Sequence, residues 1–163
     1  MKRAEKTKLL SRLLESKLIC DQVYWAREVS LDFNTSHRKR VDYMSFKPKN
    51  QSSSGIEKGI FTCYEVKSCF EDYKSGHGLN FIGEKNYIVT DMVTYKKILY
   101  DIDHNTGVYV ALPVGADKFE EWDSPKELDS NTQYELNCIN SCHETNRDYS
   151  MNVLLFCMLR SGH

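Results

Sequence analysis

Glu65 and Lys67 give this sequence its clearest chemical signal, because an acid and a base stand two positions apart in a β-forming run at residues 59–68. Alternate residues of a β-strand face opposite sides, so both charged heads emerge on one side, and the even positions from 60 to 66 face the other. Charges buried in an apolar strand are tolerated when they are paired or hold a metal ion. The spacing therefore predicts a functional site on this strand.

Asp42 lies on the preceding predicted strand. Neighbouring strands are about 5 Å apart, so its carboxylate can meet that of Glu65, and the two would repel each other. A hard divalent cation, Mg²⁺ or Mn²⁺, removes this conflict by taking Asp42, Glu65 and the backbone carbonyl of Val66 as oxygen ligands. Lys67 would orient the attacking water or stabilise charge on a phosphorane-like transition state. This set of residues suits phosphodiester hydrolysis.

The Glu-x-Lys spacing has little specificity by itself. A second copy, from Glu15 to Lys17, falls on a predicted helix and carries no such meaning. The copy at Glu65 differs because it lies on a strand, follows Asp42 on an adjacent strand and precedes a short helix. The alternative interpretation of these side chains is an ordinary salt-bridge network on a half-exposed sheet.

Helices and strands in a mixed order must position these residues. Hydrophobic periodicity and turn signals predict, in chain order, a helix at 4–18, strands at 25–33, 40–46 and 59–68, a short helix at 69–75, a strand at 86–90, a helix at 92–102, a strand at 107–113 and a final helix at 150–160. Residues 114–147 are polar and irregular, and no element is predicted there. The order indicates one α/β domain with a mixed central sheet flanked by helices.

Composition excludes some classes of protein. The chain has 163 residues, of which 40% are hydrophobic and 28% charged, as expected for one globular domain. Its net charge of −1 provides no global attraction to nucleic acid but permits a local basic patch.

Without a signal peptide or an apolar run of membrane-spanning length, we expect a cytoplasmic protein with no membrane partner. The six cysteines are then expected to be reduced thiols.

Basic residues beside Asp42 offer contacts to a nucleic-acid backbone. Arg38, Lys39 and Arg40 form a positively charged run that could hold phosphates next to a metal site. A solvated hairpin turn is the alternative for this run. His77, in a loop between two glycines, could reach the same site or be an ordinary exposed histidine.

Two motifs carry a resemblance to a known family. Residues 40–42 read Arg-Val-Asp, and residues 64–68 read Tyr-Glu-Val-Lys-Ser after a polar loop. With the order helix, three strands, helix, strand, they resemble the PD-(D/E)XK nuclease superfamily, whose fold is restriction-endonuclease-like. Residues 28–31, the basic turn and residues 76–87 are similar more specifically to MmcB-like DNA-repair and phage-type members. The resemblance covers about residues 20–112.

The resemblance implies a role for each matching residue. Asp42 and Glu65 become ligands of Mg²⁺ or Mn²⁺, and Lys67 becomes the catalytic lysine. Glu28 becomes an accessory acid near the metal, and a solvated position on the face of the strand is the alternative for this side chain. Ser68 continues the site toward bound nucleic acid.

The sequence departs from the superfamily pattern at two points. Many members carry an acid on the first helix, where Glu15 or Glu5 would be the counterpart, whereas Glu28 on the first strand is assigned here. Asp42 is preceded by Val41 rather than by proline.

The implied function is metal-dependent hydrolysis of nucleic acid, by an endonuclease or exonuclease, in DNA repair or phage DNA processing. The expected partner is nucleic acid, DNA foremost, and a homodimer through the apolar final helix is a further hypothesis. The alternative is a catalytically silent nucleic-acid-binding or protein-interaction module on the same fold. A small-molecule enzyme has no Gly-rich phosphate loop to support it.

Overall fold

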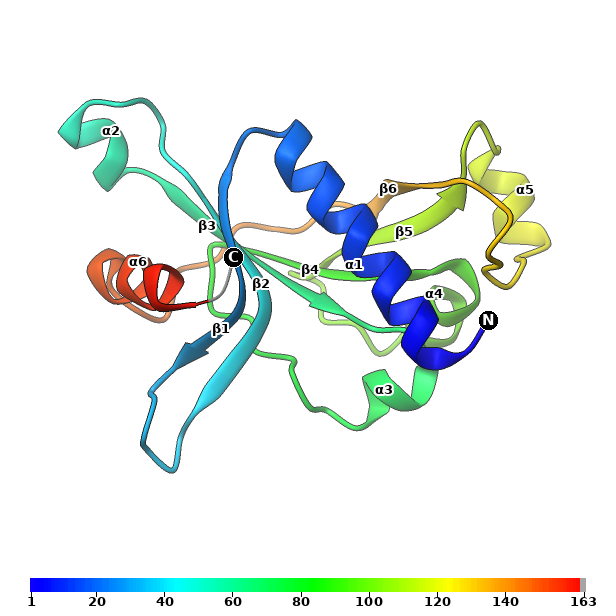
Figure 1. Cartoon of the computed structure of the whole chain (residues 1–163), viewed down its shortest axis with the longest axis horizontal. Coiled ribbons are helices and arrows are strands. Elements are labelled where there is room, and N and C mark those ends of the chain that lie inside the picture. Colours follow the sequence, from blue (N-terminus) through cyan, green and yellow to red (C-terminus); the bar gives the residue numbers. More distant parts are fainter. Residues whose placement is uncertain (162–163) are drawn as a thin grey trace.

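The computed structural model describes residues 1–161, which form one six-stranded sheet with helices packed on its two faces (Figure 1). The helices are α1 (Arg3–Cys20), α2 (Ser53–Glu57), α3 (Phe70–Lys74), α4 (Met92–Ile98), α5 (Lys118–Asp123) and α6 (Met151–Arg160). The strands are β1 (Tyr24–Leu31), β2 (Lys39–Lys47), β3 (Ile60–Val66), β4 (Lys85–Asp91), β5 (Gly107–Pro113) and β6 (Tyr134–Asn140).

The strands lie side by side in chain order, from β1 to β6. The strands β1, β2 and β3 form an antiparallel meander, β4 and β5 run parallel to β3, and β6 returns antiparallel to β5. Parallel neighbours need a crossover connection, and α3 and α4 lie in the two crossovers. The mixed α/β sheet flanked by helices, as expected from the sequence, is therefore present.

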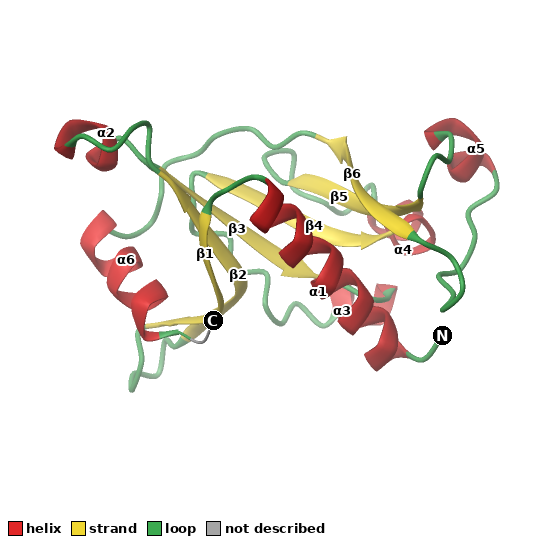
Figure 2. Ribbon diagram, turned by 45° about the horizontal axis from the view of Figure 1, so that its top comes forward, coloured by secondary structure: helices red, strands yellow, loops and turns green. Residues whose placement is uncertain are grey.

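The helix α1 crosses one face of this sheet (Figure 2). Leu10, Leu14 and Leu18 are fully buried and recur every four residues, which places them on one side of the helix. They pack against a cluster that includes Val66 of β3 and Val89 of β4. Each buried leucine contributes roughly 1.5–3 kcal/mol, so this stripe fixes α1 on the sheet. The polar side of α1 stays free to build a surface.

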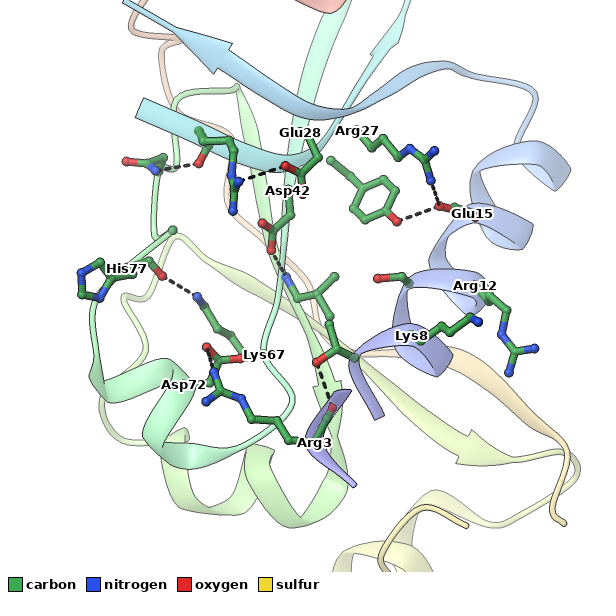
Figure 3. Close-up of a pocket in the computed structure, with 17 residues that line it drawn as sticks. Arg3, Lys8, Arg12, Glu15, Arg27, Glu28, Asp42, Lys67, Asp72 and His77 are labelled. Atoms are coloured by element: carbon green, nitrogen blue, oxygen red, sulfur yellow. Dashed lines mark hydrogen bonds and ion pairs between the residues drawn. The ribbon is translucent and has the colours of Figure 1, made fainter. Parts of the chain in front are cut away.

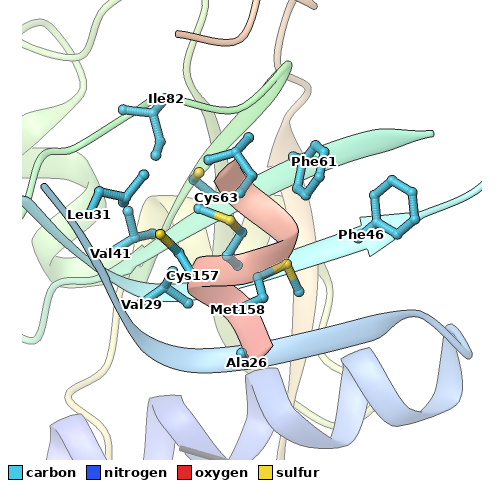
Figure 4. Close-up of a cluster of buried hydrophobic side chains, with 12 residues drawn as sticks. Ala26, Val29, Leu31, Val41, Phe46, Phe61, Cys63, Ile82, Cys157 and Met158 are labelled. Carbon is cyan, nitrogen blue, oxygen red and sulfur yellow. The ribbon is translucent and has the colours of Figure 1, made fainter. Parts of the chain in front are cut away.

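The opposite face is covered by α6 over β1 to β3 and by α4 over β4 and β5. Figure 4 shows Cys157 and Met158 of α6 among Val29, Val41 and Cys63. Along β2, the even positions Met44 and Phe46 belong to this cluster, whereas Tyr43 belongs to the cluster under α1.

Several elements differ from the sequence prediction. Residues 114–147 contain α5 and β6, for which no element was predicted. The strand β6 is only half buried, and it pairs with the edge of β5. Tyr134, Leu136 and Cys138 alternate with polar residues, a pattern that the prediction missed, and the alternation ends at Ile139, where the pairing with β5 shifts register. The helix α4 stops at Ile98 rather than at residue 102, and α2 interrupts the predicted polar loop. Phe33 lies beyond β1 and is exposed.

No helix among residues 1–161 is long and apolar enough to cross a membrane. All six cysteines are free thiols.

Candidate functional site

The site begins where β2 and β3 stop pairing. Their last paired residues are Tyr43 and Tyr64, and the same register continued by one residue would place Asp42 opposite Glu65. Beyond this pair, a side chain takes the place of the backbone hydrogen bonds between the two strands. The Oδ2 atom of Asp42 accepts a hydrogen bond from the backbone N–H of Val66 at 2.9 Å. The carboxylate of Asp42 is thereby fixed against the end of β3.

Glu65 is fully buried, and among the described residues neither of its carboxylate oxygens forms a hydrogen bond of normal geometry, although the Asn80 backbone lies close enough to lower its pKa. Burial raises the pKa of Glu65 to about 10, and the nearby Asp42 carboxylate raises it further than Lys67 lowers it. A buried carboxylate without a donor is costly, by roughly 1–3 kcal/mol for an unsatisfied group. The arrangement therefore favours a proton or a cation at Glu65.

Lys67 is also buried, with 3% of its surface exposed. Its Nζ donates a hydrogen bond to the carbonyl oxygen of His77 at 2.6 Å, and its own backbone N–H donates to the carbonyl of Val89 at 2.9 Å. The hydroxyl of Thr90 donates to the Lys67 carbonyl at 2.6 Å. The lysine head is therefore held in one place from both its side chain and its backbone.

The loop between α3 and β4 covers Glu65 and Lys67. Gly78 has φ of +76°, a conformation that L side chains rarely adopt, and a Cβ at this position would lie 2.9 Å from Glu65 Oε2 and 3.4 Å from Lys67 Nζ. Asn80 fastens the same loop to β2 through a hydrogen bond of 2.8 Å from its Nδ2 to the carbonyl of Arg40. Glycine at residue 78 thus lets backbone lie directly against the Glu65 and Lys67 side chains.

An open cleft of about 760 Å³ lies beside this pair, between α1, the strands β1 and β2, and the covering loop (Figure 3). Its lining includes Asp42, Val66 and Lys67, while Glu65 lies just beneath. The other residues that line the cleft are Arg3, Thr7, Lys8, Ser11, Arg12, Glu15, Arg27, Glu28, Arg40, Tyr43, Asp72, His77, Gly78 and Asn80.

Three ion pairs link charges on the walls of the cleft. Arg3 of α1 lies 2.8 Å from Asp72 of α3. Arg40 of β2 lies 3.0 Å from Glu28 of β1. Arg27 Nη1 lies 3.9 Å from the carboxylate of Glu15, which also accepts a hydrogen bond of 2.7 Å from the Tyr43 hydroxyl.

The structure brings together the residues predicted to do chemistry. Asp42, Glu65, the backbone of Val66 and Lys67 meet at the end of β3. Among residues 1–161, no group of three or more histidine, cysteine, aspartate or glutamate side chains converges on one point, so the oxygen-bearing side chains here are a pair. Glu28 lines the same cleft but is largely exposed and bound to Arg40, so its predicted role as a metal ligand would require that ion pair to break.

The residues predicted to bind nucleic acid are divided between two places. Arg40 and His77 line the cleft. Arg38 and Lys39 do not line it; they lie over the rings of Phe33 and Tyr149, at 5.0 and 5.9 Å from the ring centroids. Ser68 does not line the cleft either.

Ser68 is buried, with 1% of its surface exposed. Its backbone N–H and its hydroxyl both face Asp72 Oδ2 at 3.4 Å. Ser68 therefore shapes the turn from β3 into α3, and its predicted contact with nucleic acid would need this turn to open.

Sequence reasoning missed the contribution of α1. Arg3, Lys8 and Arg12 extend from its polar side along the cleft, and Gly78 closes over the reactive pair. The periodicity of α1 contained a usable signal, because the side opposite the leucine stripe must face something other than the core. The packing of α1 next to β2 was needed to show that the polar side of α1 faces the candidate site.

No family model and no curated protein matches this chain. Among solved structures, a protein of unknown function from Silicibacter pomeroyi is similar, with a TM-score of 0.58 and 16% sequence identity, over 92% of this chain and 81% of that chain. At this identity the likeness concerns the fold alone.

Proposed function

We propose that this protein is a restriction-endonuclease-like nuclease, which hydrolyses phosphodiester bonds in nucleic acid with a divalent cation held by Asp42 and Glu65. One observation carries the proposal. A fully buried glutamate, whose oxygens form no hydrogen bond of normal geometry, lies next to a second carboxylate and a lysine, beneath an open cleft with basic walls. A purely structural pair of carboxylates would be expected to have donors for both of its members.

The residues fit a hard cation. Both oxygens of Glu65 are without a partner, and Asp42 is already oriented by the Val66 amide. An all-oxygen ligand set suits Mg²⁺ or Mn²⁺. When bound, such an ion would polarise a phosphoryl oxygen and lower the pKa of a water molecule.

Each protein group has a distinct task in this scheme. Asp42 and Glu65 supply negative charge at the point where β2 and β3 diverge. Lys67, held by the His77 carbonyl, presents a cation that stabilises negative charge developing on the phosphate. The covering loop around Gly78 limits the entry of water to the reactive pair.

The arrangement of elements supports the same proposal. The order of α1, the meander of β1 to β3, α3 and then β4 parallel to β3 agrees with the core order implied by the superfamily resemblance. Asp42 and Glu65 also occupy the neighbouring strands on which the resemblance places its metal ligands. A role in DNA repair or phage DNA processing rests on the sequence resemblance alone.

The test is cleavage of supercoiled plasmid and of labelled single strands, with Mn²⁺, Mg²⁺ or EDTA. We expect metal-dependent cleavage that falls on the order of 100-fold or more in Glu65→Ala and Lys67→Ala, because each change removes charge next to the reacting phosphate. Calorimetry with Mn²⁺ should show binding that Glu65→Ala abolishes.

Glu71→Ala and Lys74→Ala are matched controls, since they remove the same residue types from exposed positions on α3. Both should cleave like wild type. If wild type cleaves neither substrate and binds no Mn²⁺, the nuclease proposal is wrong, and the silent-module alternative takes its place.

A further inference from the structure

The walls of the cleft carry more positive than negative charge. Six lysine and arginine residues line it, against four aspartate and glutamate residues. The whole chain has the opposite balance, with 22 basic and 23 acidic residues. The local excess is therefore produced by the fold, which gathers cations from α1, β1 and β2 around one opening.

Three of these six cations have an acidic partner inside the cleft, and Arg27 is one of them through Glu15. Arg3 and Arg40 are neutralised by Asp72 and Glu28. Lys8 and Arg12 differ, because within residues 1–161 neither has an ion pair or a side-chain hydrogen bond. They are one helical turn apart on α1, both exposed, and both line the cleft. These two residues are called the α1 cationic pair below.

The cleft offers little for the recognition of bases. Tyr43 and His77 are the aromatic side chains among its lining residues. Tyr43 is 6% exposed and its hydroxyl is bound to Glu15, so its ring provides no stacking surface. Binding of single strands through bases depends on such surfaces, whereas binding through phosphates depends on cations.

We infer that the α1 cationic pair, Lys8 and Arg12, binds the phosphate backbone of a nucleic-acid strand independently of its base sequence. The inference rests on the proposed function, because the same strand presents its phosphodiester to Asp42 and Lys67. The principal binding surface is then the helix α1 on the other wall of the cleft, and not the basic hairpin run that the sequence predicted. The two charges left unpaired on α1 match the polyanion that the site would receive.

The inference is tested by binding without cleavage. Fluorescence anisotropy in EDTA would use labelled oligonucleotides of mixed sequence: single-stranded DNA, duplex DNA and single-stranded RNA. We expect the double variant Lys8→Ala/Arg12→Ala to lose on the order of ten-fold in affinity or more. The slope of log K against log salt should become shallower by about two, one for each phosphate contact removed.

Two controls separate this role from general loss of charge. Arg38→Ala/Lys39→Ala removes two cations from the hairpin, and Lys8→Arg/Arg12→Lys keeps the charge on α1. Both should bind nearly as wild type does. An oligonucleotide with neutral methylphosphonate linkages should bind weakly to wild type, and oligonucleotides of different base composition should bind equally.

The outcomes distinguish the two proposals. Equal losses in the α1 and hairpin variants, or an unchanged salt slope in Lys8→Ala/Arg12→Ala, would overturn the inference while leaving metal-dependent cleavage intact. Binding that depends on Lys8 and Arg12 without any cleavage by wild type would support the inference and contradict the nuclease proposal. Absence of binding to every oligonucleotide would overturn the inference, and the plasmid assay would then decide the nuclease proposal separately.

Discussion

At the scale of single residues, Glu65 determines the character of the site. Its carboxylate forms no hydrogen bond of normal geometry and has no exposed surface, and it lies next to the carboxylate of Asp42. Desolvation disfavours the charged form of a carboxyl group, and a like charge disfavours it further. A glutamate kept in such a place reduces stability unless something binds it, which is the expected mark of a functional rather than a structural residue.

The pH dependence of stability gives a direct check of this argument. The pKa of folded Glu65 is raised from 4.5 to about 10 by burial and by Asp42. The folded state therefore keeps a proton that the unfolded state loses, and the free energy of unfolding must fall as pH rises from 4.5 toward 10. The amide side chain of the Glu65→Gln variant does not ionise, so it adds no such dependence on pH. In EDTA at alkaline pH, this variant should be more stable than wild type by about 1–3 kcal/mol.

Urea denaturation across this pH range measures the difference, which should grow with pH. Glu71→Gln, at an exposed position on α3, is the matched control and should follow the wild-type profile. Parallel profiles for wild type and Glu65→Gln would show that Glu65 ionises without cost, and that the burial argument does not hold.

At the scale of elements, the loop between α3 and β4 lies against Glu65 and Lys67 and holds the lysine head through the His77 carbonyl. Gly76 and Gly78 both have positive φ, of +67° and +76°. They differ in their surroundings, because a Cβ on Gly76 would meet no atom within 4 Å, whereas a Cβ on Gly78 would meet Glu65 and Lys67. A substitution at Gly76 would therefore introduce backbone strain alone, whereas a substitution at Gly78 would introduce strain together with contact with Glu65 and Lys67.

We expect Gly76→Ala and Gly78→Ala to lose similar stability from backbone strain, about 1–2 kcal/mol each. Gly78→Ala should in addition displace Glu65 Oε2 and Lys67 Nζ and so weaken Mn²⁺ binding, which Gly76→Ala should leave unchanged. Thermal unfolding and calorimetry with Mn²⁺ measure the two effects. Equal Mn²⁺ affinity in both variants would mean that the loop yields to the added methyl group.

At the scale of the whole molecule, Lys6 ties α1 to distant parts of the chain. Its Nζ lies 2.6 Å from Asp91, at the end of β4, and 2.9 Å from Glu127, in the segment between α5 and β6. Burial alone would lower the pKa of Lys6, but its two carboxylate partners outweigh burial and raise it. Asp91 is fully buried and also caps α4 through the Thr94 amide. This contact anchors the N-terminal half of α1, which forms one wall of the cleft.

Lys6→Met should therefore be strongly destabilising, by about 3–5 kcal/mol, because it leaves the buried charge of Asp91 without its cation. Urea denaturation measures the loss. Lys74→Met is the matched control, since Lys74 also lies 2.6 Å from an aspartate, Asp101, but in an exposed pair. Its stability should stay close to that of wild type. Equal effects in the two variants would show that burial of the Lys6 pair adds nothing.

The nearness of Asp42, Glu65 and Lys67 was accessible from the sequence because it depends on short-range rules. The two-residue repeat of a strand places Glu65 and Lys67 on one side, and an antiparallel neighbour brings Asp42 within reach. The leucine stripe of α1 and the order of β1 to β5 along the chain follow from periodicity in the same way. The prediction failed for residues 114–147, where the alternating run from Tyr134 to Cys138 is short and stands in a polar segment, and β6 forms on the available edge of β5.

The sequence by itself determined α1, α3, α4, α6, the strands β1 to β5 and the nearness of Glu65 and Lys67, since all of these follow from the spacing of residues along one chain. The tertiary structure alone decided what surrounds them. It buried Glu65 without a donor, closed Gly78 over the pair, and brought Lys8 and Arg12 to the cleft while leaving Arg38 and Lys39 outside it. The physical reason is that desolvation and charge balance depend on neighbours distant in sequence, and only packing specifies those neighbours.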